Sequence, residues 1–426
     1  MSDCASPTWG RDGHTLLAVE DAWASIAESV VPLECDEVPL SEAFGRVLAS
    51  CVEAEEDCPP FDKAMMDGFA VRSADCASPG ATLEIVGLAA AGAPAEIKVS
   101  SGQAMRINTG APMPPGPDAV VMVEKTALSS DEKQVRIEGS VASGKHVEPR
   151  GGIRKRGDTV LEPPVRLGPA EIAAAATAGA GRLSVYRRPG VAIVLTGDEL
   201  VPAGEPKRPG QIHECNGPML LTLMRQFGAE PLAPVIAPDA PDPLAAHFRT
   251  ALAEPVVVAV GGMSMGTLDL VPKTFESLGV TWKWHGVAMR PGKPVAYGRG
   301  PAGQHVFGLP GNPVSAFVCA WLFVRMVIDG LQGLPVVPPV RWRATLARAV
   351  TGSRDRRPSF VPARVWPDPE RGLLVEPNAW RGSSDPFGVA GANALLVREK
   401  AEEDGPAGSA AEVIWITPVV SDERHR

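Results

Sequence analysis

Three apolar runs, each followed at once by a loop of small, polar or acidic residues, constrain the fold of this chain more than any other feature. The runs and the loops that follow them span residues 191–196 and 197–200, 256–260 and 261–266, and 305–309 and 310–316. In an open α/β sheet, the loops at the carboxyl ends of the strands form the ligand crevice. The sequence therefore predicts one composite site built from these three loops.

The spacing of strand and helix patterns predicts an α/β plus all-β multidomain protein. Residues 187–333 alternate apolar runs with helical patterns at 217–227, 243–253 and 313–328, which is typical of a doubly wound α/β domain. Short β-like runs separated by Gly and Pro turns predict an N-terminal β domain over 49–143 and a small C-terminal β domain beyond 334. At 426 residues the chain exceeds the size of a single core.

Three further helices are predicted outside the α/β region. Residues 15–31 place apolar side chains at three- and four-residue spacing, which indicates an amphipathic helix. Residues 41–48 predict a second, short helix. The alanine-rich segment 168–179 begins with a proline near its start and predicts a third.

Charge and cysteine usage exclude several classes of protein. A net charge of −9 and a pI near 5.4 disfavour sequence-independent binding of nucleic acid, which needs clustered positive charge. The seven cysteines form no Cys-x-x-Cys pair, so a disulfide framework or a structural zinc site is not expected. The start lacks a signal-peptide core, and the longest apolar stretch, 316–328, is short for a bilayer span and contains Arg325. We expect a cytoplasmic protein without membrane contact.

The loop after 305–309 offers chemistry suited to a phosphate or another oxyanion. After Pro310 and Gly311, Asn312 suits an N-cap and Pro313 suits a first helical position. Ser315 adds a hydroxyl. Free amides at a helix start bind anions. An ordinary, well-capped turn between strand and helix explains the tetrapeptide about equally well.

The other two loops supply glycines, a hydroxyl and carboxylates. Gly197 and Glu199 follow the first run, whereas Gly261, Gly262, Ser264 and Asp269 follow the second. Carboxylates at such positions can bind Mg²⁺ beside a phosphorylated ligand. Taken alone, they more often cap a helix or face water.

Two cations and two turn motifs complete the set of candidates. Arg290 and Lys293 flank a Pro-Gly turn, which suits an oxyanion clamp, although an exposed turn is the simpler reading. Asp67 and Thr109 lie in turn sequences between strands of the N-terminal β domain, and by themselves indicate only turns.

Taken together, these motifs resemble the molybdopterin molybdenumtransferase family, whose eukaryotic relatives include the E domain of gephyrin. The resemblance covers about residues 14–420 and depends on the joint order of six segments: 59–70, 106–112, 196–200, 261–266, 291–294 and 309–316. It implies four parts: a discontinuous helical domain of 14–48 with 144–186, a β domain of 49–143, an α/β domain of 187–333 and a C-terminal β domain of 334–420.

The resemblance also implies an activity and an assembly. Family members insert molybdenum from molybdate into adenylated molybdopterin and release AMP, with Mg²⁺ assisting. They are homodimers whose cleft joins the α/β and C-terminal domains of one subunit to the β domain of the other. An adenylating enzyme of the same pathway is a further expected partner.

Carried over position by position, the resemblance gives each candidate a role. The catalytic residues would be Asp67, Asp269, Arg290 and Lys293. The residues that bind the pterin nucleotide or the oxyanion would be Thr109, Gly197, Gly261, Gly262, Ser264, Gly311, Asn312 and Ser315. The Mg²⁺ ligands would be Glu199, Glu214 and Asp269, with Glu214 in place of a family aspartate.

Several positions depart from the family pattern. Ala64 replaces a serine, Glu148 an arginine and Gly286 a lysine, Gly152 and Ile153 stand in a Gly-Glu-Asp slot, and Arg290 itself stands for a lysine. Because two carboxylates and one lysine are lost, two alternatives to a working transferase stay open. One is a paralogue that binds a pterin or nucleotide without turnover, and the other is a gephyrin-like peptide-binding scaffold.

Overall fold

The computed structural model describes residues 16–93, 96–263, 270–352, 355–399 and 403–417. These residues form two compact units. The smaller unit is Glu37–Val185, and the larger one lies within Met1–Asp36 and Tyr186–Arg426. The larger unit holds an α/β region and a C-terminal β-barrel, as the multidomain fold class predicted from the sequence requires.

A seven-stranded mixed sheet forms the centre of the larger unit. Its strand order is β16-β13-β18-β21-β20-β19, and β17 also pairs with β13. Strands β13, β18 and β21 are parallel neighbours, whereas β20 and β19 continue the sheet antiparallel. The bounds are β13 Gly190–Thr196, β16 Glu230–Pro231, β17 Val235–Ala237, β18 Val256–Val260, β19 Thr281–His285, β20 Ala296–Arg299 and β21 His305–Leu309.

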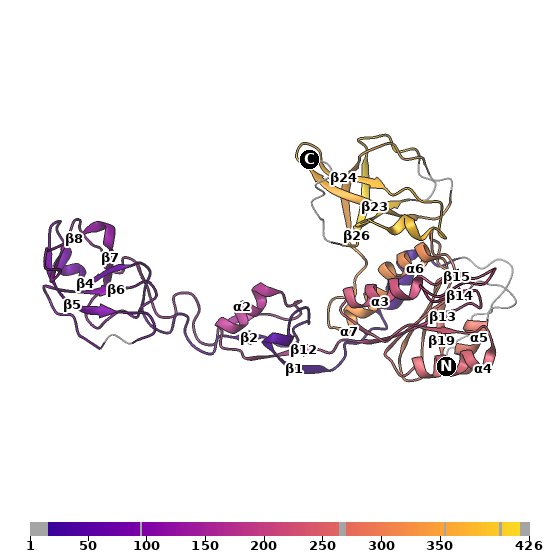
Figure 1. Cartoon of the computed structure of the whole chain (residues 1–426), viewed down its shortest axis with the longest axis horizontal. Coiled ribbons are helices and arrows are strands. Elements are labelled where there is room, and N and C mark those ends of the chain that lie inside the picture. The colour runs from indigo at the N-terminus through magenta and orange to yellow at the C-terminus, as the bar shows by residue number, and fades with distance from the viewer. Residues whose placement is uncertain (1–15, 94–95, 264–269, 353–354, 400–402, 418–426) are drawn as a thin grey trace, which may run out of the picture. The chain divides into compact units, whose positions relative to one another are not determined.

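Helices cover both faces of this sheet because its central strands are apolar on both faces. Along β13, Val191, Ile193 and Leu195 pack with one group of helices, and Ala192 and Val194 pack with the other. Figure 1 shows α3, α6 and α7 on one side and α4 and α5 on the other. The helices are α1 Val19–Ala27, α3 Asn216–Gln226, α4 Pro241–Ala251, α5 Leu270–Ser277, α6 Pro313–Cys319 and α7 Arg325–Leu331.

Helices α6 and α7 are joined by a π-helical stretch, Ala320–Val324, into one continuous helix. The helix Pro313–Leu331 is longer than the apolar run in the sequence, and by length and composition alone it could cross a bilayer. However, 83% of its apolar window is buried inside the protein, where Val318, Leu322 and Phe323 are fully covered. Its apolar character is therefore accounted for by its place at the centre of the core.

The C-terminal part of the larger unit is a closed five-stranded barrel with the order β22-β24-β23-β25-β26. The strands are β22 Arg341–Leu346, β23 Ser359–Asp368, β24 Gly372–Pro377, β25 Ala394–Arg398 and β26 Ala410–Trp415. Inward-facing residues such as Val365, Val375 and Leu396 fill its centre. Closure pairs every strand on both sides and so leaves no edge.

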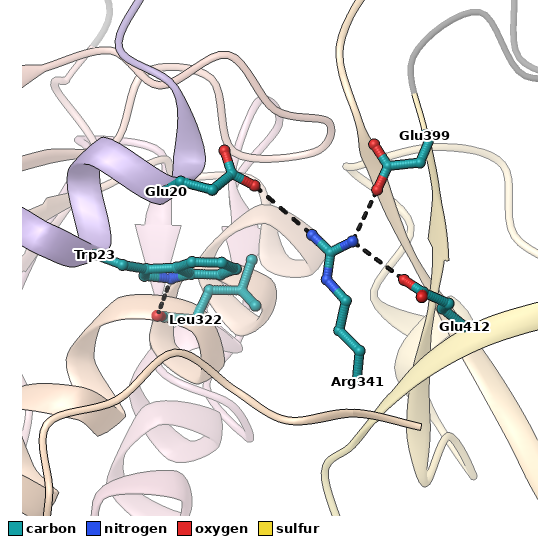
Figure 2. A network of polar contacts seen from close by, with 6 residues as sticks. All are labelled: Glu20, Trp23, Leu322, Arg341, Glu399 and Glu412. Carbon is teal, nitrogen blue, oxygen red and sulfur yellow. Dashed lines mark hydrogen bonds and ion pairs between the residues drawn. The ribbon is translucent and has the colours of Figure 1, made fainter. Parts of the chain in front are cut away.

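Arg341, the first residue of the barrel, connects the barrel to α1. Its guanidinium lies 2.8 Å from Glu399, 3.2 Å from Glu412 and 3.7 Å from Glu20 on α1 (Figure 2). One turn further along α1, the indole of Trp23 donates to the carbonyl of Leu322 at 2.9 Å. Polar contacts from α1 thus reach both the barrel and the central helix.

The smaller unit is built around a six-stranded sheet with the order β7-β4-β6-β5-β9-β8. These strands are β4 Gly68–Val71, β5 Thr82–Ala89, β6 Gln103–Ile107, β7 Ala119–Met122, β8 Thr126–Leu128 and β9 Gln134–Ile137. Residues outside this sheet form α2 Pro169–Thr177 and two two-stranded pairs, β2 Val52–Glu53 with β11 Thr159–Leu161 and β3 Lys63–Ala64 with β10 Val147–Glu148. A third pair, β1 Cys35–Pro39 with β12 Arg182–Tyr186, includes the chain positions at which the two units are divided.

Two helix predictions need correction. The short helix expected over 41–48 is only a single 3₁₀ turn, Leu40–Glu42, because Gly45 adopts a left-handed φ of +73° that ends any helix there. The helix expected over 15–31 is confined to Val19–Ala27. The alanine-rich segment does form α2, with Pro169 at its first position and the Glu171 carboxylate accepting from the Gly168 amide.

A buried histidine gives the larger unit a predictable response to acid. His305 is only 2% exposed, and its Nδ1 lies 2.8 Å from the Tyr297 hydroxyl and from a guanidinium nitrogen of Arg299. Burial, followed by the positive charge of Arg299, lowers the pKa of His305 to about 3. The unfolded chain therefore takes up this proton near pH 6.5, well before the folded chain does.

We expect the free energy of unfolding to decrease as the pH falls from 6.5 to 5, by up to about 1.4 kcal/mol per pH unit from this group. Urea unfolding across this range measures the slope. The variant His305→Gln should lose that slope, and His247→Gln on α4 should keep it. A flat profile in the unmodified protein would contradict the assignment.

Candidate functional site

The three loops predicted to form one site do leave the sheet together. Leu195 pairs with Val260 and Val260 with Leu309, so β13, β18 and β21 end side by side. The amide of Gly261 donates to the carbonyl of Leu309 at 3.1 Å. A Cβ added to Gly261 would lie 2.6 Å from the Thr196 carbonyl oxygen. The loop after β18 therefore contacts the last residues of β13 and β21.

Gly261 and Gly262 are required by this close approach. Their φ angles are +94° and +58°, in the left-handed region that favours glycine. A Cβ on Gly262 would meet the Val271 side chain at 2.7 Å. Ser264 and Asp269, the polar residues predicted for this loop, lie outside the described residues.

Glu214 and Asn216 join the loop cluster at the start of α3. The Glu214 carboxylate is 6% exposed and accepts from the Gly217 amide at 2.9 and 3.0 Å. Burial raises the pKa of Glu214, against the effect of these backbone hydrogen bonds. The Asn216 amide donates to the carbonyl of Gly311 at 2.7 Å. Glu214 therefore lies two residues before Asn216, whose side chain contacts the loop after β21.

Glu199 lies on the exposed side of the first loop. A Cβ on Gly197 would meet its carboxylate at 2.7–2.9 Å, which shows that the side chain folds back over that glycine. Within the residues that the structure describes, no group of three acidic, histidine or cysteine side chains could hold a metal ion. The third predicted ligand, Asp269, is not among the described residues.

A pocket of about 430 Å³ collects a second subset of the predicted residues. The α/β wall is formed by the cis-proline turn from Arg290 to Pro294 and by Pro310, Asn312 and Ser315. The opposite wall comes from the barrel and consists of Arg357 and residues 380–384. Lys293 and Arg290, predicted as an oxyanion clamp, thus face the same space as Ser315.

Backbone and side-chain contacts hold the two walls together. The Arg290 amide donates to the Pro358 carbonyl at 2.9 Å, and the Arg290 carbonyl accepts from the Phe360 amide at 2.8 Å. On the other side of the pocket, the Val314 amide donates to the Ser383 carbonyl at 3.1 Å. The pocket is therefore a built feature of the larger unit.

Asn312 differs from its sequence-based role. It occupies the N-cap position of α6, but its side chain makes no capping bond. Its amide nitrogen instead donates to the Ser383 hydroxyl at 3.1 Å. The side chain therefore serves the contact with the barrel wall rather than the helix start.

The charge of the pocket is strongly positive. Arg290, Lys293, Arg357 and Arg381 all line it. Sequence reasoning missed Arg357 and Arg381, which lie in barrel loops more than 60 residues from the lysine turn; their position depends on the packing of the barrel against the α/β region. Four cations around one cavity, with the hydroxyl of Ser315, provide the donors that a tetrahedral oxyanion needs.

Asp67 and Thr109 lie in the smaller unit and contact each other. The Thr109 amide donates to the Asp67 carboxylate at 2.8 Å, and the Asp67 carbonyl accepts from the Val123 amide. The structure brings this predicted pair together at one end of the six-stranded sheet. The remaining described candidates belong to the larger unit.

Comparisons with known proteins agree across the chain. Residues 17–179 match the family described as the MoeA N-terminal region (domain I and II), residues 192–330 match the probable molybdopterin binding domain, and residues 343–416 match the MoeA C-terminal region (domain IV).

Relatives and a solved structure extend the match over nearly the full length. A molybdopterin molybdenumtransferase from Staphylococcus epidermidis is 32% identical over 94% of this chain and 96% of its own length. One from a Nostoc species is 40% identical over 70% of this chain and 69% of its own. The crystal structure of a molybdopterin biosynthesis MoeA protein from Pyrococcus horikoshii superposes with a TM-score of 0.79 at 29% identity, covering 94% and 99% of the two chains. The chain belongs to the molybdopterin molybdenumtransferase (MoeA) family.

Proposed function

We propose that this enzyme of molybdenum cofactor biosynthesis inserts molybdenum from molybdate into adenylated molybdopterin and releases AMP. The observation that carries the proposal is the pocket of about 430 Å³, in which four cations surround a buried serine. Molybdate and the phosphates of the pterin nucleotide are both tetrahedral oxyanions, so the same donors suit either group. The family membership supplies the reaction class, and the cations that line the pocket support our proposal that the reaction takes place there.

Each pocket residue that was predicted from the sequence has a role in this proposal. Lys293 and Arg290 neutralise the oxyanion as it enters. Ser315, which is 3% exposed, donates its hydroxyl from the floor of the pocket. Asn312 holds the barrel loop at Ser383 and so keeps the two walls at a fixed separation. Asp67 and Thr109 are proposed to complete the cleft from the smaller unit.

We propose that residues near Glu214 supply ligands for a magnesium ion. Mg²⁺ prefers oxygen ligands, and Glu199 and Glu214 supply carboxylates. The side-chain oxygen of Asn216 is buried and has no hydrogen-bond partner among the described residues, as expected of an oxygen reserved for a ligand. When bound, the ion would neutralise the phosphoanhydride charge during cleavage. Asp269 is proposed as a further ligand, and Ser264, Gly197, Gly261, Gly262 and Gly311 as contacts to the nucleotide.

Assembly and location follow from the same proposal. We propose a cytoplasmic homodimer, in which the smaller unit of one subunit completes the cleft of the other, and docking of the adenylating enzyme that supplies the substrate. We also propose the four-part division into 14–48 with 144–186, 49–143, 187–333 and 334–420.

Complementation tests the function directly. A bacterial host that lacks its own molybdenum insertase should regain molybdoenzyme activity when it expresses this chain. If the chain binds adenylated molybdopterin in calorimetry but fails the rescue, it is a binder without turnover. If pterin, AMP and molybdate all leave its melting temperature unchanged, the proposal fails, because a bound ligand must stabilise the folded state. That result would favour a gephyrin-like peptide-binding scaffold instead.

A further inference from the structure

Asp355 makes an unusually complete contact with one of the pocket arginines. Its two carboxylate oxygens accept from Nε and Nη2 of Arg357 at 2.9 and 2.7 Å, and Oδ1 also accepts from the Arg357 amide at 3.1 Å. The parallel pair of side-chain bonds is the bidentate geometry that fixes the plane of a guanidinium. Asp355 thus determines how Arg357 is presented to the pocket.

The same carboxylate also faces the other wall. Oδ2 of Asp355 lies 4.0 Å from Nη1 of Arg290, whose backbone is held by Pro358 and Phe360 on either side of the barrel strand start. Asp355 therefore lies between two pocket cations, one from the α/β turn and one from the barrel. Asp355 itself is not one of the residues that line the pocket.

The carboxylate stays charged at neutral pH. The hydrogen bond from Arg357, together with the positive charges of Arg357 and Arg290, lowers the pKa of Asp355 to about 2. The guanidiniums of Arg290 and Arg357 and the carboxylate of Asp355 together carry one net positive charge, so these three residues still attract an anion. The main effect of Asp355 is on geometry, since an unrestrained arginine side chain loses many rotamers when it binds a ligand.

We propose that Asp355 is a positioning residue of the oxyanion pocket, which holds the guanidiniums of Arg357 and Arg290 ready for a tetrahedral dianion. This inference rests on the proposed function. Asp355 engages Nε and Nη2 of Arg357 and leaves the Nη1 hydrogens as donors. Arg290 stands where the family resemblance leads us to expect a lysine. The longer, planar guanidinium of Arg290 can approach the Asp355 carboxylate while that carboxylate also binds Arg357.

The test replaces the carboxylate by its neutral isostere. In Asp355→Asn, the KM for molybdate should rise about tenfold, because one charge-assisted pair of bonds is lost, while kcat at saturating molybdate stays near that of the unmodified enzyme. The assay follows molybdenum insertion into adenylated molybdopterin, and calorimetry with molybdate alone gives the matching change in Kd. A purely structural role would lower the melting temperature without this split between KM and kcat.

Asp329→Asn is the matched control. Asp329 accepts from Nε of Arg325 at 3.2 Å and is 20% exposed, against 19% for Asp355, but its partner Arg325 does not line the pocket, whereas Arg357 does. Its KM for molybdate should equal that of the unmodified enzyme. An unchanged KM for molybdate in Asp355→Asn would overturn the proposal. A lower KM would also overturn it, because it would mean that the carboxylate repels the anion.

A double variant tests the route through Arg357. If Asp355 acts by holding Arg357, Asp355→Asn should raise the KM much less in an Arg357→Lys background, because lysine cannot form the paired bonds. Fold-changes that multiply independently would contradict this route. Failure of the proposed function gives a different result: the unmodified enzyme would bind no molybdate and would not rescue the host.

Discussion

Lys293→Ala is expected to lower the rate of molybdenum insertion at least about a hundredfold, the usual cost of removing one charged donor from a transition state. Lys293 lines the pocket and its side chain is exposed, so its ammonium can bind the oxyanion. The variant should therefore abolish rescue of a host that lacks its own insertase. The measurements are rescue and the insertion rate with purified substrate.

The fold should survive this change. The contact that Lys293 makes with the rest of the turn is through its carbonyl, which accepts from the Val287 amide at 2.9 Å and is retained in alanine. We expect a melting temperature within about 2 °C of the unmodified protein. Lys283→Ala, on the exposed face of β19, is the control and should rescue fully. Normal rescue by Lys293→Ala would reject the site as described.

The central sheet could be predicted from sequence because its signal is local. Runs such as 256–260 are apolar at every position, which only a strand buried on both faces needs, and glycines end them abruptly. Helix α5, Leu270–Ser277, was not predicted, because Pro272 lies inside it and it is only eight residues long. It is stabilised instead by tertiary packing of Phe275 against Phe248 of α4, with ring centroids 3.8 Å apart.

The candidate site was predictable only where a single turn carries the chemistry. The turn around Lys293 and the loop around Ser315 were found because their residue types are themselves suggestive. Arg357 and Arg381 were missed, since nothing in their own segments distinguishes them from other surface arginines. The sequence also could not show that Glu199 and Glu214 do not line the pocket formed by Arg290, Lys293, Arg357 and Arg381. The positions of these two carboxylates depend on how far each loop extends from the sheet.

Two departures from the family pattern have local explanations that sequence alone does not give. A Cβ on Gly152 would lie 2.2 Å from a carboxylate oxygen of Glu148, so the unusual glutamate fills the space that the missing side chain leaves. Gly286, in place of a lysine, has a φ of +89°, and its carbonyl accepts from the Leu17 amide just before α1. The Glu148 side chain at Gly152 and the left-handed backbone at Gly286 thus accommodate the two departures locally.

Gly261→Ala is expected to destabilise the larger unit by about 3 kcal/mol or more, near the upper end of ordinary single substitutions. Two costs combine at this position. The left-handed φ of +94° costs an alanine about 1–2 kcal/mol, and its Cβ would lie 2.6 Å from the Thr196 carbonyl oxygen and 2.8 Å from its hydroxyl. Neither Thr196 atom can yield easily, because residue 196 ends β13 and its side chain is buried.

Gly372→Ala separates these two costs. Gly372 begins β24 with a φ of +76°, but a Cβ there would meet no atom within 4 Å, so the variant carries the backbone term alone. Urea unfolding of both variants should place Gly261→Ala at least about 1 kcal/mol below Gly372→Ala. Equal losses would mean that the end of β13 and the loop after β18 do not touch as the structure places them. Since the site depends on that contact, the comparison tests the junction of β13 with the loop after β18 without any substrate.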